Sequence, residues 1–272
     1  MTPDFIAAEL KPCFSESDLF EQVDDLDGEI YRQIDERRTF RILLEDRPYF
    51  VKVHHGVGWA EIFKNLLQGR PPVLGARNEW LAIERLHARG VPTMTASLYC
   101  ERGRNPSTRR SAIITQSLEP TISLEDYETD DVVQKRRILE KVARISGDMH
   151  RAGVNHRDFY LCHFLMRSDK GTDIELHVID LHRAQVRERV PLRWQVKDLG
   201  GLLFSAFEKG LTRRDLLRFI RTYSGKELRD ALSEKSLWRQ VIKRAKKLYL
   251  QDHDSLPDEI KKLLTNIGDE TL

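Results

Sequence analysis

The sequence contains no long hydrophobic segment. Its apolar runs fall well short of the roughly 20 consecutive residues that a helix needs to cross a bilayer, so no transmembrane helix is expected. The first residues, MTPDFIAAELKPCF, lack a basic region followed by an apolar block, and we expect no secretory signal. Cysteine is also scarce. Cys13, Cys100 and Cys162 are scattered along the chain, which predicts reduced thiols in a cytoplasmic protein rather than a disulfide framework.

An excess of charge of one sign is missing as well. The 45 Lys and Arg residues and the 43 Asp and Glu residues leave a net charge of +2 at pH 7, so we expect no nucleic-acid partner. No internal repeat or low-complexity segment is visible. What remains is a chain of 272 residues, 40% of them hydrophobic, which can bury a sizeable core as one large domain or as two lobes.

The first half of the chain is rich in predicted strands. An amphipathic extension, residues 1–23, comes first, with a helix expected to start at Ser15 or Ser17. A later helix over Ala76–Ala88 carries an apolar stripe formed by Trp80, Leu81, Ile83 and Leu86. The segments with strand character are Glu29–Ile34, Thr39–Leu44, Tyr49–Val53, Gly90–Tyr99 and Ser111–Leu118. A basic loop, Arg102–Arg110, joins the last two.

The second half is mostly helical. Helices are expected over Val132–His150, Leu202–Lys209, Arg213–Thr222, Lys226–Ala231 and Ser236–Leu250, with a polar tail from about Gln251. Two apolar segments, Gly153–Met166 and His177–His182, predict a β-hairpin between the first two of these helices. Glu119-Pro120 breaks secondary structure between the halves. The order predicts an α+β fold with an N-terminal extension (1–23), an N-lobe (24–119), a C-lobe (120–250) and a C-terminal tail (251–272).

Each apolar segment of the predicted hairpin contains a carboxylate. Asp158 follows His156 and Arg157 in one segment, and Asp180 lies in the other. An ionised carboxylate near a hydrophobic core is costly unless a metal, a cation or a substrate compensates its charge. The two carboxylates therefore indicate a functional site.

Lys52 and Glu79 extend this pattern into the first half. Lys52 faces away from its strand neighbours Val51 and Val53, and Glu79 lies beside the apolar stripe of its helix; each is also compatible with an ordinary solvent-facing side chain. A strand lysine, a helix glutamate, a linker, the triplet HRD and a later aspartate resemble the protein-kinase-like fold in order and spacing. Within that superfamily, the strings HRDFYLCHFL, VIDLHRAQ, KDLGGLLFSA and QSLEPTISLEDY are similar to the lipopolysaccharide core heptose(I) kinases. The resemblance extends from about Lys52 to the last helices.

The resemblance implies ATP and Mg²⁺ as cofactors and gives four residues a direct role. Asp158 matches the catalytic aspartate of the family. Asp180 matches the aspartate that holds Mg²⁺ on the ATP phosphates. Lys52 would bind those phosphates, held in place by an ion pair with Glu79.

Five further residues receive supporting roles from the resemblance. Gln116 and Leu118, at the end of the strand before the linker, would contact the nucleotide. His156 and Arg157 would hold the catalytic loop, and Asp198 would brace that loop from below.

Two departures from the kinase pattern concern the metal site. His163 replaces the asparagine five residues after the catalytic aspartate, and an imidazole nitrogen suits Mg²⁺ less well than an amide oxygen. His163 is therefore a second candidate metal residue, and the number of metal ions stays open. The usual D-F-G sequence is replaced by Asp180-Leu181-His182, so only the aspartate carries over.

A third departure is the lack of a glycine-rich loop. Gly28 is the only glycine in the region Asp24–Val53. The phosphates would have to be covered by another turn, and the hairpin Asp35–Arg38, with Arg37 or Arg38, is the candidate.

Other functions are compatible with parts of the sequence. His150, His156, His163, His177 and His182 cluster in sequence as zinc ligands could, although their spacing matches no helical zinc motif. A non-catalytic kinase-like binding module would be expected to lose the lysine or the carboxylates, which are all present here. Another envelope sugar kinase, a small-molecule kinase and a protein tyrosine kinase also remain open. The basic segments Arg102–Arg110 and Arg183–Arg193 favour an anionic acceptor.

The resemblance implies transfer of the γ-phosphate of ATP to a hydroxyl of the first heptose of the lipopolysaccharide inner core, in the family the 4-hydroxyl. The acceptor would be lipid-linked at the inner membrane face, so we expect a cytoplasmic enzyme with a peripheral membrane surface. Trp59–Leu67 and the basic helix Leu237–Leu250 are candidates for that surface. The resemblance also implies an acyl carrier protein as a partner.

Overall fold

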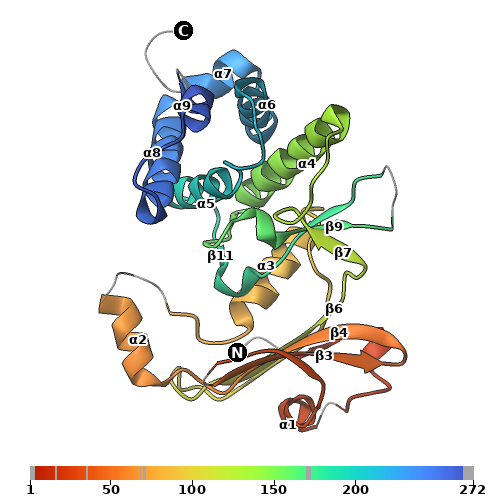
Figure 1. Cartoon of the computed structure of the whole chain (residues 1–272). Helices are drawn as coiled ribbons and strands as arrows, with labels where there is room; N and C mark the ends of the chain where they lie inside the picture. Colours follow the sequence, from red (N-terminus) through yellow and green to blue (C-terminus); the bar gives the residue numbers. More distant parts are fainter. Residues whose placement is uncertain are drawn as a thin grey trace. The chain divides into compact units, whose positions relative to one another are not determined.

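The computed structural model describes residues 4–15, 17–34, 36–67, 69, 72–169 and 173–265, which form two compact units (Figure 1). Unit 1 comprises Met1–Glu84, Met94–Leu118 and Asp180–Arg183, and unit 2 comprises Arg85–Thr93, Glu119–Ile179 and Ala184–Leu272. Each unit has a hydrophobic core of its own. Within the described residues, no helix is both long enough and apolar enough to span a bilayer.

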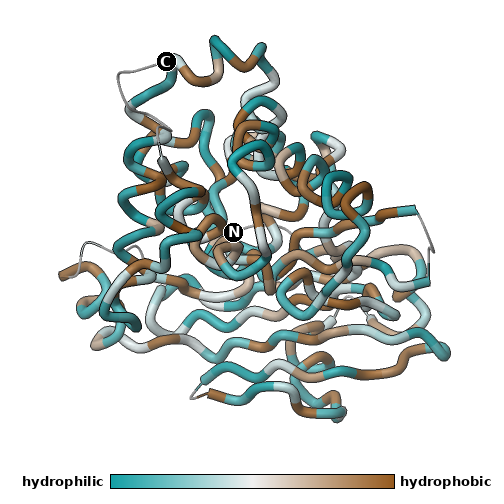
Figure 2. The backbone as a smooth tube through the Cα atoms, turned by 45° about the horizontal axis from the view of Figure 1, so that its top comes forward, coloured by the Kyte–Doolittle hydropathy of each residue, from teal (hydrophilic) through white to brown (hydrophobic). Residues whose placement is uncertain are grey.

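Unit 1 is built on a six-stranded antiparallel sheet with the strand order β1–β5–β6–β4–β3–β2. The strands are β1 (Phe5–Ile6), β2 (Glu29–Ile34), β3 (Arg37–Leu44), β4 (Arg47–His54), β5 (Ala96–Arg102) and β6 (Arg110–Gln116). Buried and half-buried residues alternate along β4 from Tyr49 to Val53 because the pleat sends successive side chains to opposite faces. Hydrophobic and hydrophilic residues are interspersed along the backbone of the molecule (Figure 2). The predicted meander of three strands is therefore present as β2, β3 and β4.

The strand predicted over Gly90–Tyr99 is shorter than expected. β5 begins only at Ala96. Residues 90–93 belong to unit 2, where Thr93 forms an isolated bridge with Val178 and donates from its hydroxyl to the Val178 carbonyl at 2.6 Å. The segment predicted as one strand is thus divided between the two units, which its composition did not reveal.

One face of the sheet packs against the N-terminal segment, which therefore is an integral part of unit 1. The core side chains from this segment are Leu10, Phe14, Leu19, Phe20 and Val23. Helix α1 (Leu19–Asp24) starts later than Ser15 or Ser17, and that part of the prediction was wrong. The hydroxyl of Ser15 bonds to Ser17 and to the amide of Gln22 instead of capping a helix.

Two longer helices complete unit 1. Helix α2 spans Gly58–Leu67 and helix α3 spans Arg77–His87, of which the part up to Glu84 belongs to unit 1. Trp80, Ile83 and Leu86 of the predicted stripe on α3 are buried, but Leu81 is 38% exposed. Glu79 is buried instead. It lies four residues before Ile83, and residues three or four apart share one side of a helix.

Unit 2 is mainly helical. Its helices are α4 (Val132–Arg151), α5 (Leu192–Ser205), α6 (Arg213–Ser224), α7 (Leu228–Ser233), α8 (Lys235–Asp252) and α9 (Asp258–Leu264). Asp131 caps α4 by accepting hydrogen bonds from the amides of Val133 and Gln134 at 2.8 and 3.3 Å. The apolar sides of α4, α5, α6 and α8 meet in one core, and α9 also contributes to it.

The strands of unit 2 are short. β7 (Thr121–Ser123), β9 (Phe164–Arg167) and β10 (Leu176–Val178) form one sheet in the order β10–β9–β7, and β8 (Val154–Asn155) pairs with β11 (Gln185–Val186). The predicted hairpin is present as β9 and β10. The rest of the segment Gly153–Met166 forms a loop and the 3-10 helix η2 (Leu161–His163).

Helix α5 was predicted to start at Leu202, after Gly200-Gly201, and this was wrong. The helix starts at Leu192 and includes both glycines, because they allow close packing rather than ending the helix. A Cβ on Gly201 would lie 2.9 Å from the carbonyl oxygen of Phe159. Gly201 therefore lets α5 approach the backbone that follows Asp158.

The segment from Gln251 was predicted to be a polar tail. Helix α8 continues to Asp252, and α9 buries Ile260, Leu263 and Leu264 in the core of unit 2. The last residues of the predicted tail, 266–272, lie outside the described residues.

Helix α9 offers a test of this core. Leu263→Ala should lower the free energy of unfolding by about 2 kcal/mol or more, because it removes buried methyl groups and leaves a cavity. Lys262→Ala, at an exposed position on the same helix, should change it by less than about 0.5 kcal/mol. Urea denaturation of both variants measures the difference, and equal midpoints would show that α9 does not belong to the core.

Candidate active site

In unit 1, the ammonium of Lys52 lies between two carboxylates. Its Nζ is 2.7 Å from Oε1 of Glu79 and 3.4 Å from Oδ1 of Asp180. The Glu79 side chain is fully buried, and that of Asp180 is 27% exposed. A buried carboxylate is tolerated when a cation compensates its charge, so Lys52 and Glu79 stabilise each other. The fold thus brings together three residues that the sequence pattern singled out: Lys52 on β4, Glu79 on α3 and Asp180 after β10.

Asp180 is held in an unusual backbone conformation. Its φ of 60° is in the left-handed region, which costs energy for a residue other than glycine and often marks a functional site. Its Oδ1 also lies 2.7 Å from Nδ1 of His182. In the sequence, His182 was part of a replaced D-F-G motif and one of five clustered histidines, whereas the structure places its ring beside this carboxylate.

Arg37 and His54 share a face of the sheet with Lys52. Arg37 pairs with His54 across β3 and β4, and Thr39 pairs with Lys52 in the same register. Directly paired residues, and residues two apart on a strand, point to the same side. Within the described chain, Nε of Arg37 and Nε2 of His54 are both buried without a hydrogen-bond partner. Burial, with the charges of Arg37 and Lys52, lowers the pKa of His54 to about 3.

Arg38 points to the opposite face. Its Nη2 donates to the carbonyl oxygens of Asp24 and Leu26, and its guanidinium lies 4.4 Å from the centroid of the Phe40 ring. The sequence left Arg37 and Arg38 as equal alternatives for covering phosphates. The alternation of β3 separates them, and only Arg37 lies on the face of Lys52. Asp35, at the tip of the predicted hairpin, is outside the described residues.

In unit 2, the loop that carries Asp158 is held by a buried carboxylate. Asp198 on α5 is fully buried and accepts hydrogen bonds from the amides of His156 and Arg157 at 2.7 and 2.8 Å. These bonds satisfy backbone donors where Arg157 takes a φ of 78°. Charge-assisted bonds of this kind are among the stronger ones in proteins. The geometry is that of a brace on the loop just before Asp158.

The brace extends further than the sequence indicated. Nε2 of His150 lies 3.3 Å from Oδ2 of Asp198, and its Nδ1 lies 2.8 Å from the hydroxyl of Tyr223. Burial raises the pKa of Tyr223, so its hydroxyl stays protonated. One signal for this network was Gly147 on α4, where a Cβ would lie 2.3 Å from the carbonyl oxygen of Tyr223 and would push α6 away.

The ring of His163 is oriented by the backbone of Asp158. Its Nδ1 lies 2.6 Å from the Asp158 carbonyl oxygen, which can only accept, so Nδ1 carries the hydrogen. The neutral ring then has its lone pair on Nε2. The ring also stacks on His156 with centroids 5.4 Å apart, and Nε2 of His156 bonds to the Ile179 carbonyl at 2.8 Å. His156 and His163 thus belong to the same rigid loop.

Gln116 and Leu118 lie where β6 ends. The side-chain amide of Gln116 donates to Oε1 of Glu9 at 3.0 Å, and the Ser97 hydroxyl donates to the same oxygen. A backbone hydrogen bond and these two donors lower the pKa of Glu9. The Gln116 side chain is thus committed to the N-terminal segment, and a nucleotide contact by Gln116 or Leu118 stays a prediction.

The histidines do not assemble a zinc site in the described part of the chain. No group of three or more His, Cys, Asp or Glu side chains there could hold a metal ion in common. The reading as a zinc enzyme therefore has no support from the geometry.

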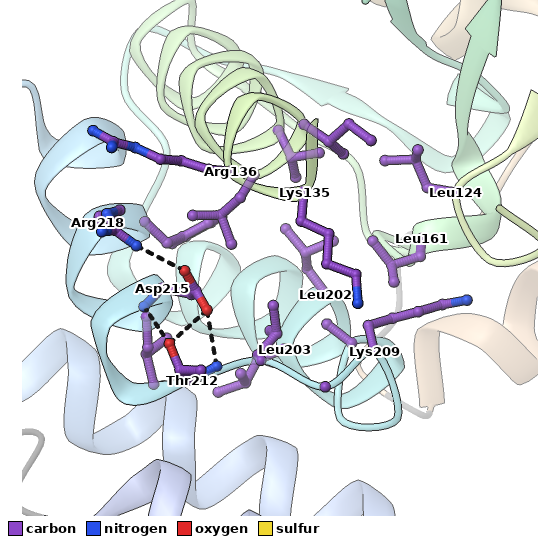
Figure 3. A pocket seen from close by; sticks show the side chains of 18 of the residues that line it. Leu124, Lys135, Arg136, Leu161, Leu202, Leu203, Lys209, Thr212, Asp215 and Arg218 are labelled. Carbon is purple, nitrogen blue, oxygen red and sulfur yellow. Dashed lines mark hydrogen bonds and ion pairs between the residues drawn. The ribbon is translucent and has the colours of Figure 1, made fainter. Parts of the chain in front are cut away.

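Unit 2 also contains an apolar cavity of about 470 Å³ (Figure 3). Leucines of α4, α5 and the surrounding loops line it, among them Leu124, Leu161, Leu202 and Leu203. Charged side chains also line it. Lys209 pairs with Glu128 at 2.6 Å and Arg218 pairs with Asp215 at 3.0 Å, and Lys135 and Arg136 stand beside them. Apolar walls with a few charged groups are typical of small-molecule sites.

Comparison with known proteins decides the family. The model of the lipopolysaccharide kinase (Kdo/WaaP) family matches residues 21–223. The chain belongs to this family. The lipopolysaccharide core heptose(I) kinase WaaP of Pseudomonas aeruginosa is 52% identical over 242 residues, covering 85% of this chain and 90% of that protein. The enzyme of the same name from Escherichia coli is 49% identical over 241 residues, covering 85% of this chain and 91% of that protein.

A solved structure agrees with this. The structure described as WaaP in complex with acyl carrier protein has a TM-score of 0.78 and 46% sequence identity, covering 91% of this chain and 99% of that one. The predicted α+β protein-kinase-like fold is confirmed. As a member of a kinase family, the chain is a phosphotransferase with an alcohol group as acceptor, and the family implies ATP as the phosphoryl donor.

The buried imidazole of His54 predicts a pH dependence of stability. Its pKa of about 3 in the folded protein lies below the ordinary 6.5, so the folded protein binds fewer protons between these values. The stability that the neutral His54 ring contributes to the folded protein is complete above pH 6.5 and is lost as the pH falls towards 3. About 2 kcal/mol should be lost between about pH 8 and about pH 5. Urea midpoints across this range measure the loss, and His54→Gln should flatten the curve; an unchanged slope would place the titration elsewhere.

Proposed function

We propose that this kinase transfers the γ-phosphate of ATP to the 4-hydroxyl of the first heptose of the lipopolysaccharide inner core. The observation that carries the proposal is the Lys52 ammonium between Glu79 and Asp180. A binding module that had lost catalysis would have no reason to keep this costly cluster. The named activity of relatives about 50% identical supports the heptose acceptor.

The two units would divide the work. Unit 1 carries the cationic face of Lys52 and Arg37, which suits the triphosphate of a nucleotide. Unit 2 carries Asp158 and its braced loop, which suits the acceptor hydroxyl. Phosphoryl transfer needs positioning and charge neutralisation more than covalent help from the protein.

Asp158 would act at the acceptor. Its carboxylate would orient the heptose hydroxyl and take its proton as the oxygen attacks the γ-phosphorus and the bond from that phosphorus to ADP breaks, so that ADP leaves. Asp198 does not touch the reactants in this scheme. It holds the amides of His156 and Arg157, so that the carboxylate of Asp158 is presented in one position.

The residues around Asp180 fit a magnesium ion. Mg²⁺ prefers carboxylate oxygens, and the carboxylate of Asp180 lies beside the cation that would bind the phosphates. When bound, the metal would neutralise charge on the transferring group. His182 bonds to Oδ1 of Asp180 and would fix the direction of the carboxylate. His163 could offer only its Nε2 as a ligand, and it stays the second candidate.

Arg37 would take over from the absent glycine-rich loop. Its register with His54 places it on the face of Lys52, and its buried Nε is available for a phosphate oxygen. An arginine binds phosphate by a charged hydrogen bond, whereas a glycine-rich loop uses backbone amides. Arg37 and a glycine-rich loop would both hold the phosphates of ATP in place.

The acceptor would be lipid-linked at the cytoplasmic face of the inner membrane, so the enzyme would work as a peripheral protein there. An acyl carrier protein would be a partner, as in the related complex. The apolar cavity of unit 2 suits an acyl chain, and the ammonium of Lys135 in its lining suits an anionic group of the carrier (Figure 3).

Asp158→Asn tests the function directly. Phosphate transfer to a heptose-containing core oligosaccharide should fall about a hundredfold or more, because the proton acceptor is removed, while ATP binding persists. Asp173→Asn, at an exposed position of unit 2, is the matched control and should keep full turnover. The same assay with an aminoglycoside and a peptide covers the rival acceptors. Transfer to peptide alone would end the sugar-kinase proposal.

Arg37→Ala and Arg38→Ala form a matched pair. Loss of a charged hydrogen bond to phosphate should raise the KM for ATP about tenfold or more in Arg37→Ala. Arg38→Ala, on the other face of β3, should leave the KM for ATP unchanged and lower only thermal stability. Steady-state kinetics with ATP as the varied substrate separates them. A raised KM for ATP in Arg38→Ala with an unchanged KM in Arg37→Ala would assign phosphate binding to Arg38.

A further inference from the structure

Helix α2 has an apolar side that faces solvent. Trp59, Phe63, Leu66 and Leu67 are 49%, 57%, 54% and 89% exposed, whereas Ile62 is buried and anchors the helix to unit 1. The spacing of three and four residues places Trp59, Phe63 and Leu66 along one side, and the rings of Trp59 and Phe63 stack with centroids 5.8 Å apart. An exposed apolar stripe of this size marks an interaction site.

A basic loop adjoins the start of α2. The amide of Gly58 donates to the carbonyl oxygen of Ser107 at 3.0 Å, which ties α2 to the β5–β6 loop. Residues 102–110 contain four arginines and no acid. Arg104 is exposed, and it forms no ion pair with any described residue. The other three arginines of the loop are ion-paired, Arg102 with Asp4, Arg109 with Glu101 and Arg110 with Glu21. Within α2 the charges of Glu61 and Lys64 balance, so Arg104 carries the surplus positive charge of this surface.

Helix α8, the other candidate of the sequence analysis, is different. It is also basic, but its apolar side chains Leu237, Trp238 and Val241 are buried in the core of unit 2. An amphipathic helix binds a bilayer through its apolar side, and α8 presents a single large apolar side chain to solvent, Leu250, instead of an apolar stripe. The two candidates, equivalent in sequence, are separated by burial.

We propose that α2, with the adjoining loop Arg102–Arg110, is a docking surface for an anionic lipid bilayer. Trp59, Phe63 and Leu67 would enter the boundary between head groups and acyl chains, where tryptophan is favoured. Arg104 would meet the anionic head groups. The apolar side chains stand on a single helix beside surplus positive charge, and this complementarity favours an anionic lipid surface as the occupant. The inference deepens the proposed function, since a lipid-linked acceptor would be presented at such a surface.

Sedimentation of the full-length protein with vesicles tests the surface. One vesicle is phosphatidylcholine alone, and the other contains equal parts of phosphatidylcholine and phosphatidylglycerol. The double variant Phe63→Ser/Leu67→Ser should lower the partition coefficient about tenfold or more on the anionic vesicles. Arg104→Gln should lower it about fivefold on the anionic vesicles and leave the neutral vesicles unaffected.

Leu250→Ser, at an exposed apolar position of α8, is the matched control and should bind vesicles as the wild type does. Failure of the wild type to bind anionic vesicles would overturn the proposal. Equal losses in Leu250→Ser and in the double variant would do the same. So would a result in which the double variant binds vesicles normally but loses self-association or a protein partner.

Measuring the phosphorylation of an acceptor distinguishes a failure of the docking surface from a failure of the proposed function. Every variant should still phosphorylate a soluble core oligosaccharide freed of lipid, because none of the changed residues lies at Lys52, Asp158 or Asp180. Vesicle binding without any transfer to heptose by the wild type would refute the proposed function and leave the docking surface intact. Transfer without vesicle binding would refute the docking surface alone.

Discussion

The ion pair between Lys52 and Glu79 is the constraint on which unit 1 depends. Glu79 is fully buried on α3, and its Oε2 accepts no hydrogen bond within the described residues, so the carboxylate relies on a single ammonium at 2.7 Å. Removing one partner of such a pair leaves an uncompensated buried charge, which costs several kcal/mol. The pair fixes α3 against β4. It also holds the ammonium 3.4 Å from Asp180, a position that suits the phosphate-binding role that we propose for Lys52. Stability and chemistry thus require the same geometry.

Unit 2 solves the same problem with other means. Asp198 is as buried as Glu79, but backbone amides and the ring of His150 compensate its charge instead of a lysine. The compensation is directional, because each carboxylate oxygen accepts from one particular amide. Gly201 makes it possible by letting α5 approach the loop. In both units, a buried carboxylate fixes the position of a residue that we propose to act in phosphoryl transfer, Lys52 or Asp158, and that residue is itself more exposed.

The sequence predicted what depends on local pattern and failed where packing between distant segments decides. Strands β2 to β4 and the lysine on β4 followed from alternation. The role of Gly200-Gly201 did not, because a glycine pair ends one helix and allows close packing in another. Leu81 was misplaced because a stripe was read from hydrophobicity alone, while the buried position belonged to a charged residue with a partner 27 positions away. The choice between Arg37 and Arg38 needed the register of β3, which two adjacent arginines cannot reveal.

His163 shows how one substitution redistributes roles within a kinase site. The bond from its Nδ1 to the Asp158 carbonyl uses one ring nitrogen to hold the loop, and the stacking on His156 fixes the plane of the ring. An asparagine at this position would bring an oxygen to the metal. The histidine brings rigidity and at most one nitrogen, which is a weak ligand for Mg²⁺. These two contacts give His163 a positioning role on the loop that carries Asp158. A site with one metal would depend more heavily on Lys52 and Arg37 to neutralise phosphate charge, and that is the face of the sheet where the cations gather.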